Sequence, residues 1–187
     1  MKKESNVRHI LRITLVLLAI AIVVAAALAV VNGLTAPIIE QANKEKTQNA
    51  IALVLPGGYE EELSEFPDET GLVSKVYKGA NGYAVEVTPV GFDNTITMMV
   101  GVSTDGTVLG ISIISHTETA GLGAVAAGKG EKSEAFREQF VGQSGSVSVS
   151  KDGGEIDAIT GATVTSRAVC DGVNAALECV AKLGLRR

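Results

Sequence analysis

The feature that most constrains this fold is an apolar run without charge, residues 13–31, in which Thr14 is the one weakly polar residue. A helix of 19 residues is about 28 Å long, close to the thickness of a bilayer's hydrocarbon core. The run therefore predicts a transmembrane helix. Residues 1–12 are then expected on one side of the membrane and the rest of the chain on the other.

The start of the chain is also similar to a secretory signal peptide, because basic residues precede the run and Ala25, Ala26 and Ala27 lie near its end. However, the run is longer than the roughly 7–15 apolar residues of a typical signal sequence, and the small-residue site at 34–36 is followed by Pro37. We therefore favour a retained anchor over a cleaved signal.

Charge sets the expected orientation of that anchor. Residues 1–12 contain four basic residues and one acidic residue, which predicts a cytoplasmic N-terminus and an extracytoplasmic location after Asn32. The overall net charge of −5 leaves −8 for the remainder, which argues against nucleic acid and against an anionic lipid surface as partners. About 155 residues outside the membrane suit a single globular unit.

The pattern of the remaining chain predicts an α+β fold, an antiparallel sheet with covering helices. Residues 32–58 read as a helical stalk or connector ended by Pro56-Gly57-Gly58, and 59–187 as the extracytoplasmic domain. The Asp-Gly pair at 105–106 is the strongest hairpin signal. Strands are expected at 72–78, 83–90, 95–103 and 108–115, and helices at 132–140 and 166–183.

Several kinds of site find no support in the sequence. His9 and His116 have no nucleophile elbow to serve, and no His/Cys cluster has the spacing of metal ligands, so neither a hydrolase triad nor a metal site is expected. Cys170 and Cys179 lie nine residues apart, on opposite faces of the expected last helix, and are not expected to form a disulfide. The acidic residues at 60–62 read as a solvated turn.

The strongest candidate site is the run DAITGATVTS at residues 157–166, directly before the last helix. A Gly-Ala pair lets the backbone approach a ligand, and a helix start points free N–H groups and a positive dipole end at the same place. The residues themselves allow two readings. Thr163 or Thr165 could simply cap the helix, or the turn could hold a phosphate.

This run closely resembles the flavinylation motif of the FMN-binding domain family. The resemblance implies that Thr163 carries FMN through a phosphoester bond, installed outside the cytoplasm by a flavin transferase that uses FAD. Asp157 is then expected to help the transferase recognise the turn. Thr160, Gly161 and Ala162 would present the threonine, and Thr165 and Ser166 would complete the cofactor site at the helix start.

A second stretch, HTETAGLG at residues 116–123, is similar to the family's His-x-Glu-Thr-Pro-Gly-Leu-Gly loop, with Ala120 in place of the proline. In the family this loop lines the flavin ring. The resemblance therefore implies that Glu118, Thr119, Gly121 and Leu122 shape the ring pocket.

The resemblance implies a function as well. The FMN-binding domain family includes components of the Rnf-type electron-transport complexes, to which the membrane helix and short outer domain correspond. The expectation is an electron-carrying flavoprotein subunit in the cell membrane, with other integral-membrane and redox subunits as partners, within an ion-translocating ferredoxin:NAD complex. The alternatives are the corresponding flavoprotein component of a Na⁺-translocating NADH:quinone reductase, a flavin-dependent redox-sensing module, and a domain that binds a free anionic ligand.

Overall fold

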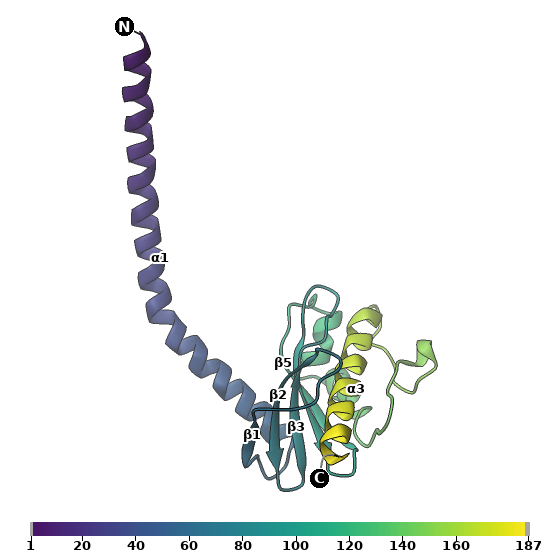
Figure 1. Cartoon of the computed structure of the whole chain (residues 1–187). Helices are drawn as coiled ribbons and strands as arrows, with labels where there is room; N and C mark the ends of the chain where they lie inside the picture. The colour runs from purple at the N-terminus through teal and green to yellow at the C-terminus, as the bar shows by residue number, and fades with distance from the viewer. Residues whose placement is uncertain (1, 186–187) are drawn as a thin grey trace. The chain divides into compact units, whose positions relative to one another are not determined.

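The computed structural model describes residues 2–185, with side-chain burial from residue 8 to residue 184. The chain forms two units, Met1–Glu45 and Lys46–Arg187. Figure 1 shows the order of the elements, which begins with the long helix α1 (Lys2–Val54).

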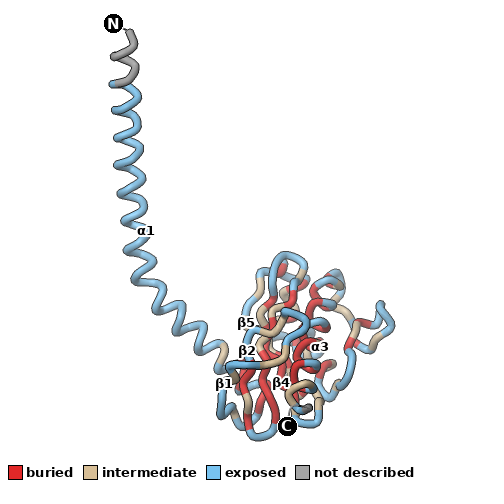
Figure 2. The backbone as a smooth tube through the Cα atoms, viewed as in Figure 1, coloured by how far each residue is buried: buried red, intermediate tan, exposed pale blue. Residues whose placement is uncertain are grey.

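The first unit consists of the N-terminal part of α1. Every residue from 8 to 46 is exposed, as the pale blue tube of Figure 2 shows. An 18-residue window of this helix has a mean hydropathy of 3.1, and within the described residues α1 is the one helix long and apolar enough to cross a membrane. Because these apolar side chains have no protein around them, a lipid environment suits them.

The second unit is built on a five-stranded antiparallel sheet in which neighbours in sequence are neighbours in space, confirming the predicted α+β class. The four predicted strands are present with small shifts at their ends. The acidic residues 60–62 are exposed as expected, but the predicted turn is wrong, because Glu61 and Glu62 belong to a short edge strand that pairs with β2. The strands are β1 (Glu61–Leu63), β2 (Val73–Gly79), β3 (Gly82–Val87), β4 (Thr97–Ser103) and β5 (Val108–Ser115).

One face of the sheet packs against α3 (Thr163–Leu185), as Figure 1 shows in yellow. Alternate residues of β3 and β4 supply the sheet side of this core, as expected for strands with both faces covered. Gly172 allows a close approach, since a Cβ there would lie 3.1 Å from side-chain atoms of Met98 and Val87. The predicted apolar stripe of the helix is buried, at Val169, Val173, Ala176, Leu177 and Val180.

The opposite face of the sheet packs against the last two turns of α1. Ile51 and Val54 are buried there with Tyr77 and Met99, in a separate small core. A side chain at Gly101 would collide with the carbonyl of Val54, so the absent side chain in β4 is what lets the helix end lie flat on the sheet. The helix ends just before the predicted Pro56-Gly57-Gly58 stop.

A long connection between β5 and α3 folds over the α3 side of the sheet. It contains the short helices η1 (Gly123–Ala127) and η2 (Ser150–Asp152) and the helix α2 (Glu131–Glu138). Phe136 and Phe140 anchor it, with ring centroids 5.4 Å apart in an edge-to-face arrangement.

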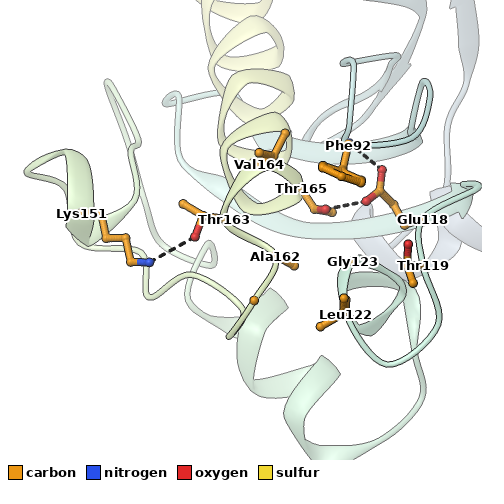
Figure 3. Close-up of a pocket in the computed structure, with 11 residues that line it drawn as sticks. Phe92, Glu118, Thr119, Leu122, Gly123, Lys151, Ala162, Thr163, Val164 and Thr165 are labelled. Carbon is orange, nitrogen blue, oxygen red and sulfur yellow. Dashed lines mark hydrogen bonds between the residues drawn. The ribbon is translucent and has the colours of Figure 1, made fainter.

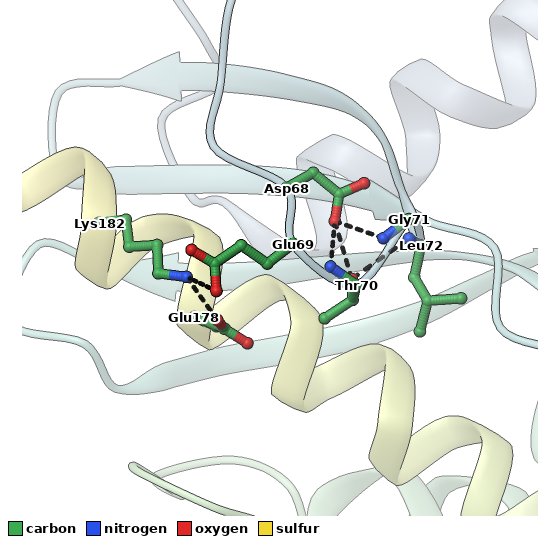
Figure 4. Close-up of polar contacts among 7 residues, drawn as sticks. All are labelled: Asp68, Glu69, Thr70, Gly71, Leu72, Glu178 and Lys182. Carbon is green, nitrogen blue, oxygen red and sulfur yellow. Dashed lines mark hydrogen bonds and ion pairs between the residues drawn. The ribbon is translucent and has the colours of Figure 1, made fainter.

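The C-terminal part of α3 is tied to the segment before β2 (Figure 4). Lys182 forms ion pairs with Glu69 at 2.7 Å and with Glu178 at 2.6 Å. Asp68 accepts hydrogen bonds from the backbone N–H groups of Thr70 and Gly71, which fixes the conformation of this loop. These exposed pairs add little stability. The helix start is held differently, and it forms the candidate site.

Candidate functional site

A pocket of about 320 Å³ opens at the start of α3 (Figure 3). Its walls come from four segments that are far apart in sequence: the loop after β3, the loop after β5, η2, and the turn before α3. It brings together nine residues of the two motif stretches at 116–123 and 157–166. Seven of them are predicted site residues: Glu118, Thr119, Leu122, Gly161, Ala162, Thr163 and Thr165. The other two motif residues are Gly123 and Val164, whereas Phe92 and Lys151 come from outside both motifs.

The turn before α3 leads directly into the helix. Gly161 has a positive φ of 78°, a conformation that a side chain would strain. The N–H of Ser166 donates to the carbonyl of Ala162 at 3.0 Å, so Ala162 is the N-cap and Thr163 is the first helical residue. The expectation of a helix starting at residue 166, with Thr163 or Thr165 as its cap, is therefore wrong.

Thr163 lies half-buried at the edge of the pocket, and its hydroxyl oxygen accepts a hydrogen bond from the ammonium group of Lys151 at 3.2 Å. The Thr163 hydroxyl does not cap the helix. Within the part of the chain that the structure describes, the backbone N–H groups of Thr163, Val164 and Thr165 have no side-chain acceptor. Free first-turn N–H groups with a lysine beside them form a site suited to an anion.

Glu118 is almost fully buried, at 7% exposure, and its carboxylate is fully engaged in hydrogen bonds. One oxygen accepts from the backbone N–H groups of Phe92 at 2.8 Å and Asp93 at 3.3 Å. The other accepts from the hydroxyl of Thr165 at 2.5 Å. Three segments of the pocket wall therefore meet at one carboxylate, whose charge is satisfied inside the protein.

Two glycines make room for that carboxylate. A side chain at Gly91 would collide with one oxygen of Glu118, and a side chain at Gly123 would collide with the other. At Gly123 the added Cβ would also lie 2.5 Å from the hydroxyl of Thr165. The close packing of this cluster explains why glycine occupies both positions.

Ser166 is fully buried beneath the turn and stabilises it. Its hydroxyl donates to the carbonyl of Ala162 at 3.0 Å and accepts from the N–H of Ile159 at 3.0 Å. Ser166 therefore supports the site from below and does not line the pocket.

The structure does not bring three other predicted residues into this pocket. Gly121, Asp157 and Thr160 line a neighbouring surface depression that also contains residues of α2. Asp157 is exposed, and its backbone is fixed by the side-chain amide of Gln139, which accepts from the Asp157 N–H at 2.7 Å. The carboxylate is thus presented at the surface beside the turn.

Phe92 and Lys151 are the site residues that sequence reasoning missed. Phe92 is 71% exposed and lines the pocket, so its ring is available to a ligand there. Phe92 follows the predicted end of a strand at Pro89. The sequence around it does not indicate that this segment contacts Glu118. Lys151 precedes an Asp-Gly-Gly turn, a signal that the chain reverses there but not that the lysine returns to Thr163.

The two cysteines lie on α3, both buried and both free. Burial raises the pKa of the Cys170 thiol to about 12 and that of Cys179 to about 11. Their sulfurs are therefore protonated at neutral pH and behave as apolar core groups. Within the described residues, no three His, Cys, Asp or Glu side chains gather in a way that could hold a metal ion.

Comparison with known proteins gives two family matches. The sequence model of the FMN-binding domain matches residues 91–178, a range that contains every residue lining the pocket. The model of the RnfG N-terminal region matches residues 1–54, which corresponds to α1.

Curated relatives match almost the whole chain. The chain is 33% identical to the G component of the Na⁺-translocating ferredoxin:NAD⁺ oxidoreductase complex of Acetobacterium woodii, with 95% of this chain and 94% of the relative covered. It is 32% identical to the G component of the ion-translocating oxidoreductase complex of Methanosarcina acetivorans, with 94% and 97% covered. The G component of the proton-translocating complex of Clostridium ljungdahlii is 41% identical over 52% of each chain. The chain therefore belongs to the RnfG family, whose members include these G components.

Proposed function

We propose that this chain is the electron-carrying flavoprotein subunit of a membrane-bound, Rnf-type ion-translocating ferredoxin:NAD oxidoreductase, with FMN attached to Thr163 by a phosphoester bond. The observation that carries the proposal is the pocket of the FMN-binding domain, which has the Thr163 hydroxyl at its edge. The names of the family relatives supply the complex. Because these relatives include both sodium- and proton-translocating complexes, we assign no coupling ion.

The residues present fit an FMN group. The free N–H groups at the start of α3 and the ammonium of Lys151 suit the phosphate end. Phe92, Leu122 and Val164 offer apolar surface for a flat aromatic ring. A volume of about 320 Å³ lies at the lower end of the range for ligand sites, as expected when part of a long cofactor remains outside.

The attachment itself requires a flavin transferase with FAD as its second substrate. A bond forms between the Thr163 hydroxyl oxygen and the phosphorus of the FMN half, the pyrophosphate bond of FAD breaks, AMP leaves, and the hydroxyl proton is released. Asp157 is exposed beside the turn and outside the pocket, where a modifying enzyme can reach it. This position supports a role for Asp157 in recognition by the transferase, and it avoids repulsion between its carboxylate and the phosphate.

The bound flavin would supply the redox chemistry, since its ring accepts and passes on electrons singly or in pairs. The chain's own residues hold and orient it. Glu118 fixes the loop of Phe92 against the first turn of α3, so the apolar wall and the attachment point keep one geometry. A covalent bond keeps the cofactor in place where no cytosolic flavin pool can replace it. Other membrane and redox subunits would be the electron donor and acceptor.

For the topology we propose a cytoplasmic segment at 1–12, a membrane helix at 13–31, a helical connector at 32–58 and an extracytoplasmic FMN-binding domain at 59–187. The exposure of the apolar residues of α1 supports an anchor in the cell membrane. Helical structure continues past residue 31 to Val54, whose side chain packs on the sheet. This continuity favours a retained helix over a cleaved signal, as does the family match over 1–54.

Intact-mass measurement of the full-length chain, produced with and without a flavin transferase, tests the proposal. We expect the transferase to add the mass of FMN less one water to the wild type and to Thr165→Ala, but not to Thr163→Ala. Under denaturing conditions the modified band should fluoresce under ultraviolet light. Flavin that washes out on denaturation would support the free-ligand alternative, and attachment in Thr163→Ala would show that another residue carries it.

A further inference from the structure

The ammonium group of Lys151 lies 3.2 Å from the hydroxyl oxygen of Thr163, reaching it from η2 across the edge of the pocket (Figure 3). We propose that Lys151 is the charge partner of the phosphate at Thr163. It holds the hydroxyl before attachment and pairs with a phosphodiester oxygen afterwards. This inference rests on the proposed function, because it assigns a residue to the phosphate end of that cofactor.

The backbone of Lys151 is fixed to the helix that carries Thr163. The next residue, Asp152, forms a two-pronged ion pair with Arg167 on α3, with both N–O distances at 2.7 Å. Arg167 lies four residues after Thr163, about one turn along the same helix. At the other side of η2, the N–H of Ser150 donates to the carbonyl of Ile156 at 2.8 Å. The flexible side chain of Lys151 therefore extends from a backbone position that is held beside Thr163.

The charges around the pocket leave Lys151 as the group available to a phosphate. Arg167 is occupied by Asp152, and the Glu118 carboxylate is satisfied by three donors inside the protein. Lys151 is the one cationic side chain among the described residues that line the pocket. A phosphorus bonded to the Thr163 oxygen would bring its free oxygens within reach of the ammonium on one side and of the helix N–H groups on the other.

This arrangement has a consequence for the attachment reaction. While the new bond forms and AMP leaves, negative charge is spread over the oxygens on phosphorus, and a cation placed there in advance stabilises that charge. Removing one such donor from an enclosed site slows a reaction by about 10²–10³-fold. Because Lys151 is exposed, we expect a smaller effect, about tenfold, when its charge is removed.

The test is a time course of FMN attachment to the purified, unmodified full-length chain in detergent, with FAD and a flavin transferase, followed by intact mass. Lys151→Gln should be modified about tenfold more slowly than the wild type, and Lys151→Arg should recover most of the rate. Lys129→Gln is the matched control, because Lys129 is an exposed lysine that does not line the pocket. It should behave as the wild type.

A second measurement separates a phosphate contact from a docking contact with the transferase. In the modified chains, the ³¹P resonance of the phosphodiester should shift in Lys151→Gln and stay unchanged in Lys129→Gln. An unshifted resonance, or a Lys151→Gln chain modified at the wild-type rate, overturns the inference while leaving Thr163 as the attachment point. A wild-type chain that is never modified would instead count against the proposed function.

Discussion

The hydroxyl of Thr165 donates a 2.5 Å hydrogen bond to the buried carboxylate of Glu118, which lies 47 residues earlier in the chain. The bond joins the first turn of α3 to the loop after β5, and the other oxygen of Glu118 joins both to the loop of Phe92. Thr165 is 1% exposed, so this contact is shielded from water. The threonine thus serves the pocket as a tie between segments, a role different from the helix cap expected of it.

Replacing Thr165 by valine should show how much its hydrogen bond to Glu118 stabilises the fold. The change keeps the shape of the side chain but removes one donor from a buried carboxylate, which costs about 1–3 kcal/mol in the free energy of unfolding. Thr165→Ser keeps the hydroxyl and should lose less. Urea unfolding of the full-length chain in detergent, followed by the near-ultraviolet dichroism of its tyrosines, measures both. Equal stability of the valine and serine variants would contradict the importance of this hydrogen bond.

The glycines beside Glu118 give a second prediction. Gly91→Ala and Gly123→Ala each place a methyl group against the carboxylate, so the cluster must shift, and overpacking of this kind costs about 1–3 kcal/mol. Gly184→Ala is the control. A Cβ there meets nothing within 4 Å, and Gly184 lies at the end of α3, so alanine there should not destabilise the fold.

The same unfolding experiment distinguishes these cases. The two alanine variants at the carboxylate should unfold at lower urea concentration than the wild type, and Gly184→Ala at an equal or higher one. Wild-type stability of Gly123→Ala would mean that the loop has room that the structure does not show.

Much of the fold could be predicted from the sequence because its signals are local. Alternation in the strands, the Asp-Gly turn at 105–106 and the apolar stripe of α3 each depend on neighbours a few residues away. The edge strand β1 was missed because its acidic residues give no alternation, and it forms only by pairing with Tyr77 and its neighbours. The early start of α3 was missed because the threonines resemble cap residues, whereas tertiary contacts occupy both hydroxyls.

The candidate site, like the fold, could be predicted where its signals are local and not where they depend on contacts between distant segments. The two motifs could be found because each is a continuous stretch, and nine of their residues do line one pocket. Phe92 and Lys151 reach the pocket through chain segments whose local sequences carry no such signal. The role of Glu118 was equally hidden, because a glutamate in a polar loop does not reveal that its carboxylate is buried on three donors.

Phe92 should influence the flavin more than the fold. At 71% exposure its ring contributes little to the core, so Phe92→Ala should leave the unfolding free energy close to that of the wild type. In the modified chain it should shift the visible absorption bands or the reduction potential, because the ring would lose an apolar neighbour. Val90→Ala, an equally exposed change at 72%, is the control and should shift neither. An unchanged spectrum and potential in Phe92→Ala would place the flavin ring away from Phe92.

The cysteines should react only after unfolding. Burial raises the pKa of Cys170 to about 12 and that of Cys179 to about 11, so almost no thiolate forms at pH 8, and both sulfurs are covered. Treatment of the folded chain with iodoacetamide at pH 8 should leave its mass unchanged, whereas the same treatment in urea should add two labels. Rapid labelling of the folded chain would show that α3 opens readily.

The ion pair between Asp152 and Arg167 should resist acid. Hydrogen bonds from the Arg167 guanidinium, and then its charge, lower the pKa of Asp152 below the ordinary value near 3.8. A carboxyl whose pKa is lower in the folded state stabilises the fold above its unfolded pKa, and this contribution is lost as the pH falls through the folded value. Arg167→Gln should therefore return the pKa of Asp152 towards its ordinary range, as a ¹³C NMR titration of the carboxyl groups would detect.

Lys182→Gln provides the control for that titration. It removes the partner that lowers the pKa of Glu69 at the other end of α3, and it should leave Asp152 unchanged. The ion pair of Asp152 also holds the backbone next to Lys151. Arg167→Gln should therefore slow FMN attachment, as Lys151→Gln does, whereas Lys182→Gln should not. An Asp152 titration that is identical in Arg167→Gln and wild type would show that the ion pair is absent in solution, and Lys151 would then need another anchor.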